Sequence, residues 1–142
     1  MKQFILFTSI LLSSICYAKT PLNDTPIVID ADQFEYIGNE TDGSIIARGN
    51  VIAKQDNQTV DANFIKYDFK KEILIAEDQV KIIDKDGYII DADKVILSDR
   101  LTLGSIYGFT VLMPDKSTLK GTYAKKNNEF ISNIEKGSYT SC

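Results

Sequence analysis

The chain has 142 residues, a formal net charge of −4 and no histidine. This length is enough for one domain with a buried core and leaves little room for a second. Without histidine the usual general base and metal ligand are missing, and an acidic chain without a basic face is a poor partner for nucleic acid. We therefore expect a non-enzymatic protein with no cofactor and no metal.

Residues 1–18 have the pattern of a cleaved signal peptide. Lys2 precedes an apolar run over residues 4 to 12, and the small residue Ala18 stands at the expected cleavage point. The run is shorter than the roughly 20 residues that cross a bilayer. We predict export with cleavage after Ala18. An uncleaved anchor and lipidation at Cys16 are the remaining alternatives.

Residues 19–26 contain two prolines, which keep a chain extended, and are predicted to form a linker. From residue 27 to residue 142 one pattern of residue types returns with a period of about 30 residues, as in stacked units of a few strands each. Each copy begins with an apolar residue and places a small residue two positions later. These small residues are Ala31, Ala62, Ala92 and Gly121.

The second copy indicates that each strand bends. Val60 and Ala62 are two residues apart, but the next apolar positions are Ile65 and Tyr67, so the parity changes after the alanine. Because side chains alternate faces along a strand, this change predicts a bulge or a corner at the small residue. Strands that bend at equivalent points form two facing layers, so the predicted fold class is an all-β antiparallel jelly roll or sandwich. Unrelated hairpins are the alternative.

Other strands and turns follow from alternation and from turn residues. The segment from Asp84 to Gly87 predicts a hairpin turn, because glycine adopts the positive φ that tight turns require. Residues 106–113 are apolar on both faces, which leaves their register open, and residues 129–134 are expected to form the last strand. Two predicted strands place an apolar set on one face, namely Ile45, Ala47, Val51 and Ala53 in one and Leu74, Ala76, Val80 and Ile82 in the other.

Aspartates and one cysteine are the candidates for chemistry. The aspartates beside the small residues are either a carboxylate ladder that binds cations or outward polar residues next to a buried alanine, and we favour the second interpretation. Cys142 is the only thiol left once the leader is removed, so it is expected to be free or to form an intermolecular disulfide. The aspartates concerned are Asp30, Asp32, Asp61, Asp91 and Asp93.

The A-R-G-N-V element at residues 47–51, the D-A-D corners and the ending G-S-Y-T-S-C at residues 137–142 resemble the OstA-like family of lipopolysaccharide transport. The ending is most similar to the N-terminal periplasmic domains of LptD assembly proteins, and the resemblance covers residues 27–142. It implies a V-shaped β-jelly roll in the periplasm that holds lipid A acyl chains and joins other jelly rolls through its edge strands. An association with the outer membrane is also implied.

The resemblance has one large departure. LptD proteins continue into an outer-membrane β-barrel, whereas this sequence ends at Cys142. Either a separate chain supplies the barrel, or the domain works alone as a bridge, or the reading frame is a remnant of a split gene. The disulfides that the family forms from this region have no partner cysteine here.

Two functions remain open: a lipopolysaccharide-transfer module, and a structural or interaction β-domain with a filled core. An apolar groove would bind acyl chains with about 0.8 kcal/mol per buried methylene. Both interpretations predict two exposed sheet edges, so lipid occupancy distinguishes them. In the first interpretation the residues expected to line the groove are Val51, Phe64, Tyr67, Val80, Ile82 and Phe109.

Overall fold

The computed structural model describes residues 25–39, 41–98, 101–127 and 131–142, so the predicted leader and most of the predicted linker lie outside the described residues. The described part is all strand and turn, and none of it forms a helix that could span a membrane. The strands are β1 (Val28–Asp30), β2 (Gln33–Ile37), β3 (Ser44–Gln55), β4 (Gln58–Asp68), β5 (Ile73–Ile83), β6 (Ile89–Ser98), β7 (Leu103–Leu112), β8 (Thr118–Lys126), β9 (Ile131–Glu135) and β10 (Ser138–Thr140).

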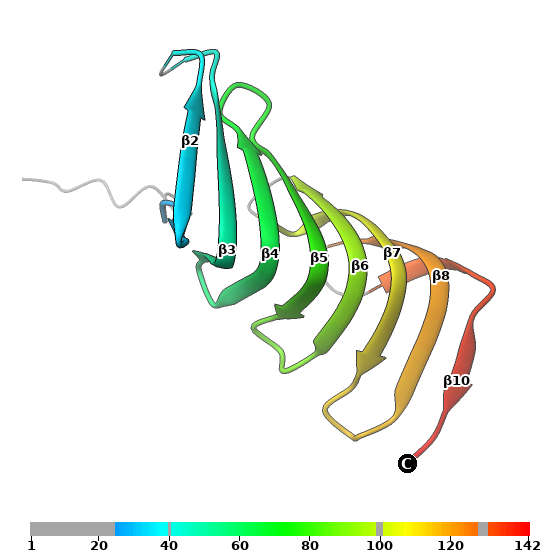
Figure 1. The fold of residues 1–142 in the computed structure, drawn as a ribbon. Helices are drawn as coiled ribbons and strands as arrows, with labels where there is room; N and C mark the ends of the chain where they lie inside the picture. The colour runs from blue at the N-terminus through cyan, green and yellow to red at the C-terminus, as the bar shows by residue number, and fades with distance from the viewer. Residues whose placement is uncertain (1–24, 40, 99–100, 128–130) are drawn as a thin grey trace, which may run out of the picture.

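All ten strands belong to one open antiparallel sheet with the order β1-β3-β4-β5-β6-β7-β8-β10 (Figure 1). At one edge β2 pairs with the first half of β3 and β1 with its second half. At the other edge β10 pairs with the first half of β8 and β9 with its second half. Each edge of the sheet is therefore made of two short strands.

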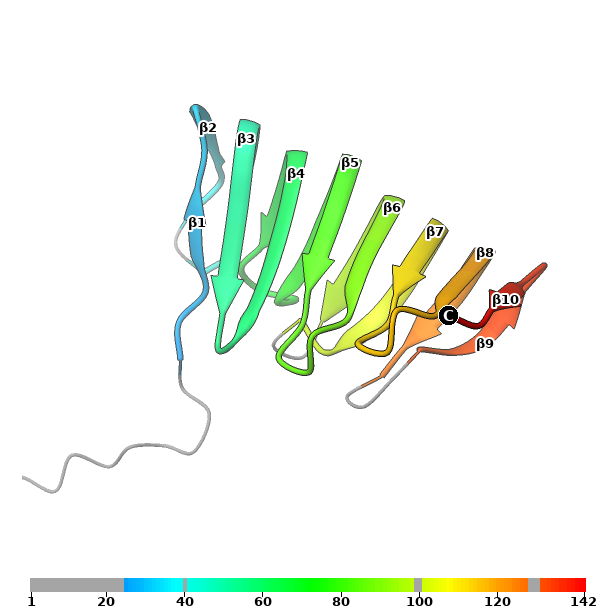
Figure 2. The same ribbon diagram turned by 90° about the horizontal axis from the view of Figure 1, so that it is seen from below.

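The sheet folds into two layers along a corner that crosses the long strands, as Figure 2 shows. Pairing shifts register between Arg48 and Val51 in β3, and again after Asp61 in β4 and after Glu77 in β5. The first layer contains β2 and β9, and the second contains β1 and β10. The turns that end the strands lie on the side away from the corner, which we call the mouth. The predicted change of parity after Ala62 is confirmed.

Polar side chains hold the backbone at the corner. The Asn50 amide donates a hydrogen bond to Asp32 Oδ2 at 2.9 Å, and the Asn63 amide donates to Asp78 Oδ2 at 3.2 Å. Asn50 and Asp78 both have positive φ, at 46° and 66°, a conformation that asparagine and aspartate tolerate better than most residues. These hydrogen bonds therefore give Asp32 and Asp78 a structural role at the corner.

The inner faces of the two layers pack on each other and form the core. The apolar sets predicted for β3 and β5 lie on this inner face, with Ile45 half-buried near the free edge. The register that the sequence left open in β7 places three side chains inward. These are Ile106, Phe109 and Val111.

The predicted hairpin turn at residues 84–87 is confirmed, because Gly87 N donates to Asp84 O at 3.2 Å. The expected last strand, residues 129–134, overlaps β9, although residues 129 and 130 lie outside the described residues. The sequence did not predict β10, which adds a second short strand to the C-terminal edge. The chain turns between β9 and β10 at Lys136 and Gly137, where Lys136 has a φ of 49°.

Candidate functional site

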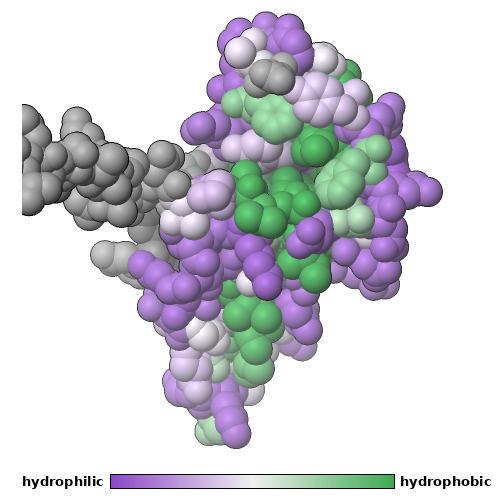
Figure 3. All heavy atoms as spheres, turned by 90° about the vertical axis from the view of Figure 1, so that its left-hand side faces the viewer, coloured by the Kyte–Doolittle hydropathy of each residue, from purple (hydrophilic) through white to green (hydrophobic). Residues whose placement is uncertain are grey.

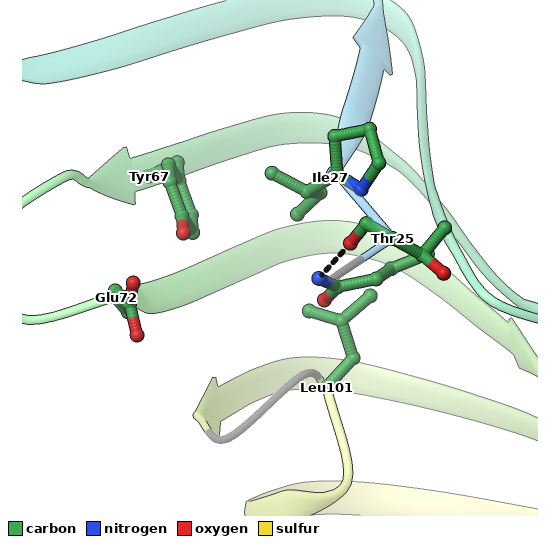
Figure 4. A pocket seen from close by; sticks show the side chains of 7 residues that line it. Thr25, Ile27, Tyr67, Glu72 and Leu101 are labelled. Carbon is green, nitrogen blue, oxygen red and sulfur yellow. Dashed lines mark hydrogen bonds between the residues drawn. The ribbon is translucent and has the colours of Figure 1, made fainter. Parts of the chain in front are cut away.

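A cavity of about 230 Å³ lies between the two layers at the mouth. Its walls come from the segment before β1, the ends of β3 and β4, and the turns that follow β4 and β6 (Figure 4). The cavity is smaller than most small-molecule pockets, which run from about 300 to 1,000 Å³, so it fits only part of a large ligand. The lining residues are Thr25, Pro26, Ile27, Gln55, Tyr67, Glu72 and Leu101.

Each layer contributes one wall of this cavity. Tyr67 belongs to the first layer and pairs with Ile45 and Leu74 on the inner face. Gln55 belongs to the second layer, and its side-chain amide donates to the carbonyl oxygen of Thr25 at 2.9 Å. This hydrogen bond ties the segment before β1 to the second layer.

Aromatic side chains extend the first-layer wall toward the N-terminal edge. The ring centroids of Tyr67 and Phe69 are 5.7 Å apart, and those of Phe69 and Tyr36 are 5.6 Å apart. Burial raises the pKa of the Tyr67 phenol, and the carboxylates of Glu72 and Asp68 raise it further. The phenol therefore stays neutral at physiological pH and keeps a hydrogen-bond donor at the cavity.

The interior is open at the end of the sandwich where β1 and β2 form the edge of the sheet. Phe34 and Tyr36 of β2 stand opposite Ala47 and Ile45 on the inner face, yet they are 49% and 51% exposed. Figure 3 shows apolar side chains gathered in the middle of this end, with polar side chains on both sides. At the other end Tyr139 of β10 is 60% exposed. Both ends therefore expose apolar or aromatic side chains.

The structure separates the six predicted groove residues into three groups. Tyr67 lines the cavity. Phe64 does not line the interior, contrary to expectation: after the bulge that follows Ala62, Ile65 faces inward and Phe64 outward, with the Arg48 guanidinium 5.6 Å from its ring centroid. The remaining four are packed in the core away from the cavity, and they are Val51, Val80, Ile82 and Phe109.

Sequence reasoning identified only Tyr67 among the seven residues of the cavity. The other six lie before β1, at the last position of β3 and in the turns after β4 and β6, where side-chain alternation gives no signal, and they are Thr25, Pro26, Ile27, Gln55, Glu72 and Leu101. The one available signal was an apolar residue, Leu101, within a turn.

A buried lysine lies close to the cavity. Lys126 faces inward at the end of β8, and its ammonium donates to the carbonyl oxygen of Thr102 at 3.2 Å. Burial lowers the pKa of Lys126, while the carboxylate of Asp84, in the turn that ends β5, opposes this shift. Lys126 thus fastens the turn that carries Leu101 to β8.

Metal chemistry finds no support in the described residues. Among them no group of three or more histidine, cysteine, aspartate and glutamate side chains could hold an ion. Cys142 is exposed near the C-terminal edge. The cavity at the mouth and the two open ends give access to the interior between the layers. Two further hollows, of about 510 and 190 Å³, lie along the corner, where Gln79 borders both.

These features define a class of protein: an open, folded β-jelly roll with an apolar interior that is accessible at its ends. The crystal structure of LptH, described as the LptA homologous periplasmic component of the lipopolysaccharide transport device of Pseudomonas aeruginosa, is similar to this chain with a TM-score of 0.68 and 14% identity. The similarity covers 84% of this chain and 97% of LptH. No family model matches the sequence, and a search of curated proteins finds no match. The comparison confirms the predicted fold class.

Proposed function

We propose that this protein is a non-enzymatic, periplasmic module of lipopolysaccharide transport that holds acyl chains between its two layers. The observation that carries the proposal is the cavity at the mouth, which lies beside the apolar core and has both apolar and polar side chains, Glu72 among them, in its lining. Each methylene that an acyl chain buries against the apolar side chains contributes about 0.8 kcal/mol. The likeness to LptH and the leader-like residues 1–18 support the same assignment.

The packing of the core suggests how an acyl chain enters. Val80 and Ile82 are buried in the core and do not line this cavity, whereas Ile27, Tyr67 and Leu101 border it. In our proposal the chain end first occupies the cavity. It then reaches the deeper residues by separating the layers, because both faces are apolar and lose no hydrogen bonds when they part.

The edges of the sheet suggest the partners. The free backbone groups of β1 and β2 at one edge, and of β9 and β10 at the other, can pair with strands of another jelly roll. The exposed Phe34, Tyr36 and Tyr139 would then continue the interior from one domain to the next. The LptD-like ending at residues 137–142 supports a place next to an outer-membrane barrel.

A structural or interaction domain with a filled core is the second candidate. The observation in its favour is that contacts within the protein itself bury Val80, Ile82 and their inward neighbours. In this case the edges would bind partners and the interior would bind nothing.

Native mass spectrometry of protein purified from a lipopolysaccharide-producing host tests the proposal. We expect a folded monomer that carries a mass increment equal to the host lipid, and loss of the increment after denaturation and refolding without lipid. Folded protein that is bare in both samples would leave only the structural candidate.

A further inference from the structure

We propose that the side chain of Leu101 is a plug that occupies the mouth of the interior and leaves it when an acyl chain enters. The inference rests on the proposed function, because it describes how access to the lipid site is controlled. It assigns a role to a turn residue that neither the repeat nor the strand pattern requires.

Leu101 has an unusual position for a turn residue, because its side chain is only 3% exposed. Its φ of 64° lies in the left-handed region that a Cβ atom disfavours. Exposed turn residues such as Glu72 and Lys116 have a similar φ, at 52° and 68°, so the burial of the side chain is what distinguishes Leu101.

The turn after β4, one repeat earlier, has the same length as the turn after β6 but no buried apolar side chain at the equivalent position. Four residues separate the paired Asp68 and Ile73 at the end of β4, and four separate the paired Ser98 and Leu103 at the end of β6. By position Leu101 corresponds to Lys71, which is exposed, and by its left-handed φ it corresponds to Glu72, at 52°, whose charged side chain lines the cavity. The inward apolar side chain is thus specific to the turn after β6.

Hydrogen bonds on both walls of the cavity keep the Leu101 side chain in its buried position. On the first layer Thr102 N donates to Ser98 O at 3.2 Å, and Lys126 donates to Thr102 O. On the second layer the bond from Gln55 to Thr25 holds Ile27 in place. Figure 4 shows that Ile27 and Leu101 point into the cavity from their two walls.

An acyl chain can replace the Leu101 side chain with little loss of buried apolar area. The hydrocarbon of the ligand takes over the contacts of the leucine, and the left-handed backbone can relax once the side chain has left. The main barrier to entry is therefore the release of Leu101 and Thr102 from these positions, including the bond from Lys126 to Thr102. Weakening the plug should accelerate uptake more than it changes final occupancy.

Stopped-flow uptake of the fluorescent fatty acid cis-parinaric acid tests the plug. Leu101→Ala should take up the probe roughly tenfold faster than the wild type. Leu74→Ala is the matched control, because Leu74 is buried in the same layer and loses the same atoms but does not line the cavity. Its uptake rate should equal that of the wild type.

Lys126→Met provides a second variant if Leu101→Ala does not fold, because it keeps the plug and removes the bond to Thr102 together with the charge that faces Asp84. It should also accelerate uptake. Equal rates in the wild type, Leu101→Ala and Lys126→Met, or equal acceleration in Leu74→Ala, would overturn the plug and leave lipid binding intact. The absence of uptake by every variant, with all of them folded, would overturn the proposed function and the plug with it.

Discussion

Replacing Ile82 by aspartate is expected to unfold the domain. Ile82 is 0% exposed and pairs with Val60 and Ile90, which are equally buried. A carboxylate at this position would have to be desolvated in an apolar core, a change that costs about 4 kcal/mol or more. Since a whole domain has a stability of only about 5–15 kcal/mol, little folded protein should remain. Urea unfolding followed by circular dichroism measures the effect.

The next residue on the same strand supplies the control. Ile83 points to the outer face and is 41% exposed, so Ile83→Asp should change the free energy of unfolding by no more than about 0.5 kcal/mol. If Ile82→Asp instead unfolded at the same urea concentration as Ile83→Asp, the two layers would not be packed on each other at this position.

The second large effect is expected for Gly104→Ala. A Cβ atom on Gly104 would lie 1.8 Å from the carbonyl oxygen of Ile96 in the neighbouring strand. Backbone cannot move aside as a side chain can, so the pairing of β6 with β7 would have to open. We expect a loss of about 3 kcal/mol or more, the upper range for overpacking. Urea unfolding of the variant gives this value.

Gly108→Ala is the comparison for this prediction. There the added Cβ meets the side chain of Asp93, at 2.2 Å from Oδ2, and this side chain can rotate away. The remaining cost comes from the φ of 57°, about 1–2 kcal/mol for a residue with a Cβ. Equal losses for the two variants would contradict the close approach of β6 and β7.

The corner and the inner faces were predictable because alternation is a property of sequence. A strand that keeps one face in the core must place apolar residues two apart, and a change of parity, as between Ala62 and Ile65, must then mark a bulge. The same logic correctly placed Leu74, Ala76 and their partners inward. Nothing beyond the side-chain period was needed for these residues.

The orientation of Phe64 shows where residue type misleads. Parity after the bulge places Ile65 inward and therefore Phe64 outward, but an aromatic side chain suggested the interior. On the outer face the ring lies under the Arg48 guanidinium, a cation–π contact of about 0.5–1 kcal/mol at an exposed site. Such a contact depends on cross-strand register, which the residue type does not reveal.

The cavity was not predictable because turns and the segment before β1 build most of it. Ile27 and Leu101 lie outside the strands, and their inward orientation depends on hydrogen bonds between segments that are distant in sequence. β10 was missed for a similar reason. Its three residues are all exposed, and only pairing with β8 makes them a strand.

A photo-crosslinking amino acid at position 67, compared with the same amino acid at position 64, tests the central claim most directly. The two positions are three residues apart on β4, but Tyr67 lines the cavity and Phe64 faces outward. In a lipopolysaccharide-producing host, lipid held between the layers should crosslink at position 67 and not at position 64. Crosslinks of equal yield at both positions, or none at position 67 in folded protein, would contradict an interior lipid site.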